Sequence, residues 1–250
     1  MDTNAIYVLW LRDVKRFFRA RSRVVGMLIM PVFFMVGLGF GFNSLIHLGS
    51  GSYIEFMVPG IIGMSLLFTA VSSGVSILWD KQFGFLKEIL VTPNSRVAVA
   101  IGRVAGGATT AVLQGVLVVF IALLIGFTIH VSAIALLSII FMLLTAATFI
   151  GLGLAFGAII EDFQGFQLIT SLVTFPLFFL SGSIFPISAL PESLQYVSYA
   201  NPLTYGIDGL RGTLMGSSSF PLALDFAVML LSAVAMVLLA SYAFTRIEVS

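Results

Sequence analysis

The chain has 250 residues, of which 59% are hydrophobic and 9% are charged, and its formal net charge is +1. Soluble domains are roughly half apolar and a quarter charged, so water is excluded as the main solvent of this chain. The small net charge excludes an extended basic surface for nucleic acid, and the absence of cysteine excludes disulfides, thiolate nucleophiles and cysteine-ligated metals.

The first predicted element is an amphipathic helix over residues 4–22. Apolar residues recur at helical spacing from Tyr7 to Phe18, and basic residues occupy the other side. Helices of this kind lie in the headgroup plane of a membrane, so we expect an interfacial helix, either as a plain anchor or as a moving part. The residues assigned to it are Trp10, Arg12, Lys15, Arg16, Phe17 and Arg19.

Six apolar runs are long enough to cross a bilayer as helices, which takes about 20 residues each. They cover residues 24–46, 56–78, 104–129, 133–160, 166–185 and 220–244. Alternation of period two is absent, so barrel strands are not predicted. The predicted fold is an all-α membrane protein with six transmembrane helices, the interfacial helix, a coupling helix between spans two and three, and short external re-entrant helices between spans five and six.

Basic residues predict the orientation of these spans. All of the 12 Lys and Arg residues except Arg211 fall before the first span, between the second and third, or after the last. Because basic flanks are retained on the cytoplasmic side, both termini are predicted to be cytoplasmic, in a multi-pass protein of the plasma membrane.

The segment between spans two and three, residues 80–96, is predicted to contain a short cytoplasmic helix with an apolar ridge. Phe83, Leu86 and Leu90 share one helical face, and Pro93 ends the helix. Such a ridge either docks a partner protein or folds back on its own bundle, and the pattern alone leaves both open.

Two short external helices are predicted within residues 186–216, between spans five and six. Pro191 begins the first helix, and Asn201 with the proline after it supplies an N-cap and a first helical residue for the second. Asp208 and Arg211 lie three residues apart on the second helix, where they can pair.

Ionisable residues of the predicted spans fall near the span ends. Glu55 and Asp225 lie near outer ends, whereas Arg103, Glu161 and Asp162 lie near inner ends. We expect these charges to be solvated at the interface. Proton and sodium relays use ionisable groups buried at mid-membrane depth. The predicted spans carry no acidic residue at that depth, which argues against an ion-coupled mechanism. The two histidines are too isolated for a metal site, and the Gly-Lys-Ser/Thr of a phosphate-binding loop is absent. The chain is therefore predicted to have no metal site, catalytic residue or nucleotide site of its own.

Small residues predict close helix contacts in two of the spans, because a glycine face lets backbones approach. These glycines are Gly37, Gly39 and Gly41 in the first span, and Gly151, Gly153 and Gly157 in the fourth.

Two segments of the chain resemble the type-2 exporter permeases of the ABC transporter superfamily. LSGSIFPISALPESLQYVSYANPLTYGIDGLRG, residues 180–212, is similar to that family's exit from span five, its Leu-Pro, its Asn-Pro-Leu-Thr-Tyr and its closing Arg-Gly. GFLKEILVTPNSR, residues 84–96, resembles its coupling segment, in which Gly-x-Leu-Glu-x-Leu-x-x-Thr-Pro is usual. Lys87 stands where that pattern has an acid, and Glu88 follows it.

The resemblance implies an assembly in which two permeases pair, as a homodimer or with a sibling, above two cytoplasmic ATPase subunits. ATP and Mg²⁺ would bind to those subunits, and their closure would rock the interfacial helix and the spans. The residues implied for coupling to the ATPase are Phe83, Gly84, Phe85, Leu86, Lys87, Glu88, Leu90, Thr92 and Pro93. Those implied for an external gate are Gly182, Pro186, Pro191, Asn201, Pro202, Tyr205, Asp208 and Arg211.

The predicted function is ATP-driven export of hydrophobic or amphipathic molecules, such as a drug-like compound or a lipid, from the cytoplasm or the inner leaflet. Export of a lipid-linked polysaccharide, an ion-coupled secondary carrier and an integral membrane enzyme are the alternatives. A carrier should show inverted repeats or spans broken at mid-membrane, and neither is visible in the sequence. An enzyme should carry clustered His, Asp or Glu at one interface, where only Glu161 and Asp162 adjoin.

Overall fold

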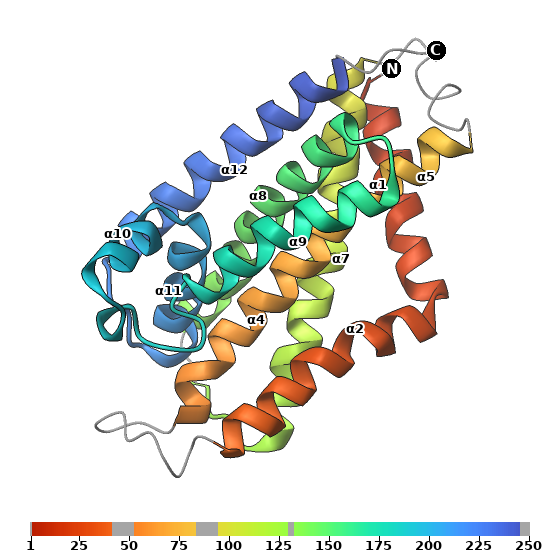
Figure 1. Cartoon of the computed structure of the whole chain (residues 1–250). Coiled ribbons are helices and arrows are strands. Elements are labelled where there is room, and N and C mark those ends of the chain that lie inside the picture. Colours follow the sequence, from red (N-terminus) through yellow and green to blue (C-terminus); the bar gives the residue numbers. More distant parts are fainter. Residues whose placement is uncertain (1, 42–52, 84–94, 130–132, 246–250) are drawn as a thin grey trace.

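The computed structural model describes residues 2–41, 53–83, 95–129 and 133–245. All regular structure in these ranges is helical, which confirms the all-α class. Long helices run beside one another as an elongated bundle (Figure 1). We call the end where α1 (Asp2–Arg19) begins and α12 (Leu222–Thr245) ends the terminal end. The opposite end, the far end, holds α10 (Glu192–Ala200) and α11 (Pro202–Met215).

The predicted helix over residues 4–22 stops earlier than expected. α1 ends at Arg19, and α2 (Arg21–Phe34) begins after Ala20. The two stretches Thr3–Arg19 and Val24–Gly39 are bent by 71° against each other. α2 passes into a π-helical stretch, η1 (Met35–Phe40), a wider winding that follows a proline within α2. The first predicted span is thus helical as far as it is described, and residues 42–46 lie outside the described part.

The second predicted span is interrupted near its end. α4 (Tyr53–Ser72) and α5 (Val75–Gln82) are separated by a turn at Ser73 and Gly74. The Cβ of an alanine at Gly74 would overlap the carbonyl oxygen of Gly153. Small residues let the chain turn where it meets its neighbour, but Tyr53–Asp80 remains one stretch long and apolar enough to cross a membrane, as the prediction of the second span requires.

The remaining spans begin and end with local signals. α7 (Arg96–Ile125) starts at Ser95, whose hydroxyl accepts a bond from the Ala98 amide, and ends before Gly126 at a φ of 109°. A short 3-10 turn, η2 (Ala133–Leu136), leads into α8 (Leu137–Ile159). α9 (Phe163–Phe179) begins after Asp162, whose carboxylate caps it. It ends six residues before the predicted end of the fifth span. α12 matches the predicted sixth span.

The structure supports fewer complete crossings than the sequence predicts. Within the described ranges, four helical stretches are long and apolar enough to cross a membrane, and the bent pair raises the number to five. α9 has 17 residues and is shorter than those stretches. Each of the six predicted segments contains a helix, but six crossings remain a prediction.

The glycine prediction holds for the fourth span and fails for most of the first. α8 packs against α4, α7, α11 and α12. A Cβ at Gly153 would lie 2.5 Å from the Val71 carbonyl oxygen, and a Cβ at Gly151 would lie 2.7 Å from that of Met236. By contrast, a Cβ at Gly37 or Gly41 would meet nothing within 4 Å, since no described segment packs there.

Candidate functional site

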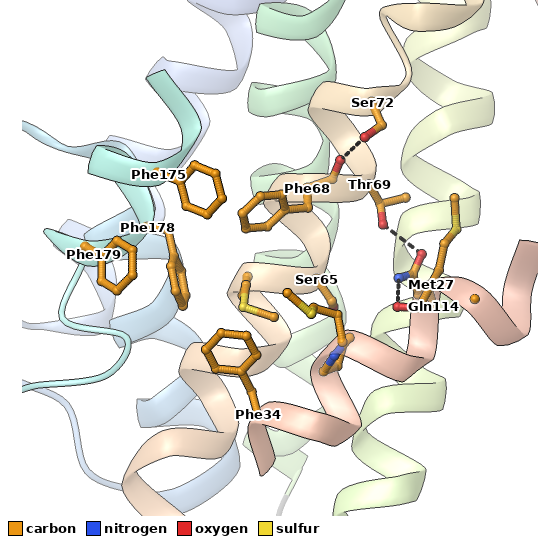
Figure 2. Close-up of a pocket in the computed structure, with 14 residues that line it drawn as sticks. Met27, Phe34, Ser65, Phe68, Thr69, Ser72, Gln114, Phe175, Phe178 and Phe179 are labelled. Atoms are coloured by element: carbon orange, nitrogen blue, oxygen red, sulfur yellow. Dashed lines mark hydrogen bonds between the residues drawn. The ribbon is translucent and has the colours of Figure 1, made fainter. Parts of the chain in front are cut away.

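A pocket of about 260 Å³ lies among α2, α4, α7 and α9 (Figure 2). Most of its lining is aromatic or thioether, and none of its lining residues carries a charge. The apolar lining consists of Met27, Met30, Pro31, Phe34, Met64, Phe68, Phe175, Phe178 and Phe179. Flexible thioethers adapt to differently shaped partners, so this lining suits apolar ligands of more than one shape.

Four phenylalanines from three different helices meet at one wall of this pocket. The ring of Phe68 in α4 lies 5.5 Å from Phe175 and 6.3 Å from Phe178, both in α9. Phe34 in α2 lies 6.5 Å from Phe178 in an edge-on arrangement. Edge-to-face pairs are favourable arrangements of aromatic rings, so this wall stabilises the helix positions and offers ring faces to a ligand.

Gln114 is the principal polar group of the pocket. The Thr69 hydroxyl donates to its side-chain oxygen over 2.8 Å, and its amide donates over 3.4 Å to the Met27 carbonyl (Figure 2). These bonds join α7 to α4 and α2. Gln114 was not singled out in the sequence analysis, although an amide inside an apolar run of span length was a usable signal.

A buried ion pair lies toward the terminal end, between α5 and α7. The Arg103 guanidinium pairs with Asp80 and donates a bond of 2.9 Å to the Ser76 hydroxyl. Arg103 is only 3% exposed, so the expectation of interfacial solvation is wrong for this residue. The turn before α5 explains the difference, because it brings the carboxylate of Asp80 against the first turns of α7.

Only the start of the predicted coupling segment falls among the described residues. Phe83 follows α5, is 74% exposed, and stacks on Trp79 with ring centroids 5.4 Å apart. Trp79 also contacts the ring of Phe163 at the start of α9. Phe83 therefore presents an apolar ring at the surface. The other predicted coupling residues, namely Gly84, Phe85, Leu86, Lys87, Glu88, Leu90, Thr92 and Pro93, lie outside the described residues.

The predicted interfacial helix packs along α7. Trp10 donates a bond of 3.0 Å to the Thr109 hydroxyl. A Cβ at Gly102 would lie 3.1 Å from the backbone of Ile6, and one at Gly106 would lie 2.9 Å from Asp13. Of the residues assigned to this helix, Lys15, Arg16 and Arg19 are exposed, whereas Trp10, Arg12 and Phe17 are partly buried. Asp13, which also pairs with Arg12 over 3.5 Å, was not among the residues assigned to this helix.

At the far end the predicted pair of Asp208 and Arg211 is confirmed. The two side chains approach to 3.6 Å, and Arg211 also donates to the Gly182 carbonyl over 3.1 Å. Its guanidinium carbon lies 4.1 Å from the centre of the Phe56 ring. Burial lowers the pKa of Arg211 to about 10, and the Asp208 charge opposes that shift. Arg211 therefore remains a cation at neutral pH.

Asp208 and Asn201 fix the segments that surround this pair. The Asp208 carboxylate accepts bonds of 2.8 and 2.9 Å from the Ser219 and Phe220 amides. Asn201 caps α11 by accepting from the Leu203 amide, as predicted, and also donates over 2.7 Å to the Leu177 carbonyl in α9. α11 is thus attached to the segment before α12 and to the end of α9.

A second pocket, of about 210 Å³, is centred on these groups. Four of the predicted gate residues line it, namely Gly182, Pro186, Asp208 and Arg211. Pro191 and Pro202 lie at the starts of α10 and α11, and Asn201 lies between these helices. Tyr205 donates to the Tyr199 carbonyl and its ring lies 5.4 Å from Phe220. The predicted gate residues therefore gather at one end of the bundle.

The remaining charges of the predicted spans behave in two ways. Glu161 and Asp162 are exposed, as expected, and Glu55 accepts a bond of 3.1 Å from the Thr128 hydroxyl near the surface. Asp225 is 0% exposed, so the expectation of solvation is wrong for it. α12 packs against α8 and α11, which are separate helices of the bundle, so the burial of Asp225 depends on long-range packing.

Comparison with known proteins gives a consistent assignment. Residues 4–215 match the family described as ABC-2 type transporter. The chain is 30% identical over 244 residues to Inner membrane transport permease YadH of Escherichia coli (strain K12), covering 94% of this chain and 92% of that protein. It is 27% identical over 225 residues to Nodulation protein J of Rhizobium leguminosarum bv. viciae, covering 88% and 86% respectively.

A further relative is Nodulation protein J of Rhizobium meliloti (strain 1021), which is 29% identical over 201 residues, or 79% of this chain and 76% of that protein. The family match extends from α1 to the end of α11, and so includes the first pocket, most of the lining of the second, and the pairs of Arg103 with Asp80 and of Arg211 with Asp208. The chain therefore belongs to the ABC-2 type transporter family, as a multi-pass permease of the cell membrane whose ATP is hydrolysed by a separate ATPase subunit.

Proposed function

We propose that this permease exports hydrophobic or amphipathic molecules, drug-like compounds or lipids, out of the cytoplasm or the inner leaflet. The observation that carries the proposal is the uncharged pocket among α2, α4, α7 and α9, with its wall of phenylalanines and its Met residues. A ligand that leaves lipid for such a pocket exchanges one apolar surround for another, while Gln114 and Thr69 offer hydrogen bonds that lipid tails lack.

The ATPase is proposed to dock at the segment that begins with Phe83. The exposed ring of Phe83 stands directly after α5, and the pair of Asp80 and Arg103 connects α5 to α7. α7 in turn contributes Gln114 to the pocket. A displacement of the docked segment therefore has a continuous path of packed groups to the pocket. A second permease copy is proposed to complete the assembly.

The terminal end is proposed to face the cytoplasm and the far end the exterior. Exposed basic residues of α1 support this orientation, since such residues are retained on the cytoplasmic side. Under this orientation α1 serves as the interfacial helix, and the pocket around Asp208 and Arg211 lies at the exit, where α10 and α11 act as the gate.

A second candidate cargo is a lipid-linked glycan. The exit pocket favours it, because its lining combines an ion pair with serine and threonine hydroxyls and the ring of Tyr199. Such groups recognise hydroxylated molecules, and two of the relatives are nodulation proteins. Family membership removes the ion-coupled carrier and the membrane enzyme from consideration.

Reconstitution with the partner ATPase subunit tests the proposal. We expect ATP-dependent movement of a fluorescent phospholipid or a lipophilic fluorescent dye across the bilayer. Ser72→Phe, at the rim of the pocket, should reduce this movement several-fold. Leu172→Phe, which adds a ring on an exposed part of α9, is the matched control and should leave it unchanged.

Three outcomes contradict the proposal. The first is movement of either probe that Ser72→Phe does not affect, and the second is movement driven by an ion gradient in liposomes without the ATPase. Phe83→Asp tests docking separately and should abolish co-purification with the ATPase. The third contradicting outcome is a Phe83→Asp variant that still binds the ATPase and still couples its ATP hydrolysis to transport. ATP-dependent movement of a lipid-linked glycan, with neither probe moved, identifies the second candidate instead.

A further inference from the structure

The carboxyl group of Asp225 is buried without a hydrogen-bond partner. Its side chain is 0% exposed, and neither oxygen has a hydrogen-bond partner among the described residues. Polar groups in protein interiors are normally satisfied, so an exception calls for a physical explanation. An ionisable group inside a membrane-spanning helix is in addition a marker of a functional site.

The helices that enclose Asp225 contribute a second polar atom without a partner. Met229 lies one turn after Asp225 on the same face of α12. A Cβ at Gly206 of α11 would lie 3.4 Å from the Met229 sulfur and 2.6 Å from the Thr145 hydroxyl oxygen. That hydroxyl, in α8, is fully buried and also lacks a hydrogen bond. α8, α11 and α12 therefore meet at Gly206, where the Thr145 hydroxyl lies, and the Asp225 carboxyl group lies one helical turn before Met229 of this contact.

In the part of the chain that the structure describes, the charges near this site do not neutralise a carboxylate. On α11, the charge of Asp208 acts on Asp225, and the charge of Asp225 acts on Tyr205. Asp208 is an anion that already engages Arg211, and the Tyr205 hydroxyl donates to the Tyr199 carbonyl. α8, from Leu137 to Ile159, carries no ionisable residue. An unpaired anion in such surroundings is strongly unfavourable.

We propose that Asp225 is a proton-binding site, in which the carboxylate takes up one proton and is held as the neutral carboxylic acid while α11 covers it. Proton uptake removes the buried charge and supplies an O–H donor. No other bond forms or breaks, and the proton comes from water at the far end.

The site is also connected to the far-end pocket. α11 covers Asp225 from Tyr205 and Gly206, and the same helix carries Asp208 and Arg211 of that pocket. A movement of α11 away from α12 would expose the carboxyl group to water and release its proton. By linkage, proton binding favours the covered arrangement by the same factor. This second step rests on the proposed gate, whereas the proton site does not.

Infrared difference spectra of the purified permease in nanodiscs test the proton site without the ATPase. At neutral pH, we expect a carbonyl band of a protonated carboxylic acid in the wild type that Asp225→Asn removes. Glu55→Gln is the control, since Glu55 lies near the surface and accepts a hydrogen bond from Thr128. It should leave this band in place.

Two further outcomes decide against the proposal. If Asp225→Asn removes no such band, the carboxyl group is ionised and has a partner. If sodium raises the melting temperature of the wild type but not that of Asp225→Asn, the ligand is a metal cation. Because transport is not measured, failure here leaves the proposed export function untouched, and failure of export leaves this inference untouched.

Discussion

Arg103 in α7 and Asp80 in α5 form a buried ion pair, which the Ser76 hydroxyl extends by accepting a bond from the guanidinium. Asp80 stands three residues before Phe83, the first of the predicted coupling residues. A push on that segment therefore reaches α7 through a charged contact rather than through apolar packing alone. Charged contacts of this kind are directional, and removing one partner leaves the other buried without a counter-charge.

Truncation of either partner should destabilise the permease. We expect Arg103→Ala to lower the free energy of unfolding by roughly 3 kcal/mol, because a buried charge loses its partner. Ser76→Ala should cost about 1 kcal/mol, since it removes one hydrogen bond. Thermal unfolding in detergent measures both. The charge-swapped double variant, Asp80→Arg with Arg103→Asp, should recover part of the loss. If the double variant loses as much stability as the separate losses of Asp80→Arg and Arg103→Asp added together, a direct pair is contradicted.

Glycine contacts offer a comparison within one protein. Gly153→Ala places a Cβ 2.5 Å from the Val71 carbonyl oxygen, so we expect a loss of about 1–3 kcal/mol, as for other overpacked cores. Gly37→Ala meets nothing within 4 Å and should be neutral or stabilising by up to about 1 kcal/mol, because alanine favours helix. Melting temperatures of the two variants check this order. A destabilised Gly37→Ala variant would show that another chain packs on η1.

Local features of this fold were predictable, and long-range ones were not. The cap of α11 at Asn201 and the pair of Asp208 and Arg211 follow from residues within one or two helical turns. The partner of Asp80 lies on another helix, the burial of Asp225 depends on packing between helices, and no periodicity in a single sequence shows which helices meet. Arg103 and Asp225 were predicted to lie near span ends and to be solvated there, so their burial was missed.

The turn between α4 and α5 was partly predictable from the sequence. Ser72, Ser73 and Gly74 are small and form a weak breaker signal, but the surrounding apolar run outweighed it. The functional-site residues also include predictable and unpredictable ones. The far-end residues were recognised from a motif, whereas the pocket around Gln114 requires four helices that are distant in sequence.

The charge state of Arg211 gives a pH prediction. Its pKa in the folded protein is about 10, below the ordinary value of a guanidinium, because the group is buried. Both folded and unfolded states therefore bind this proton at neutral pH, and between the two values the unfolded state binds more. Stability of the wild type relative to Arg211→Gln should be constant from about pH 6 to about pH 9 and rise only above about pH 10. Chemical unfolding across this range measures it, and a slope near neutrality would assign the titration to another group.

Asn201 joins two functions that substitutions can separate. Its side-chain oxygen caps α11, and its amide reaches the Leu177 carbonyl in α9. Serine retains the cap but not the second bond, whereas alanine loses both. We expect Asn201→Ser to cost about 1–2 kcal/mol for the buried carbonyl left unpaired, and Asn201→Ala to cost roughly 1 kcal/mol more for the lost cap.

Asp162 provides the matched control for this experiment, because it caps α9 from an exposed position. Asp162→Ser should be nearly neutral and Asp162→Ala should cost about 1 kcal/mol. The excess cost of Asn201→Ser over Asp162→Ser then measures the contact between α11 and α9. If the two serine variants are equally stable, α11 is held against α9 by packing alone, and movement of the far-end helices would not require this bond to break.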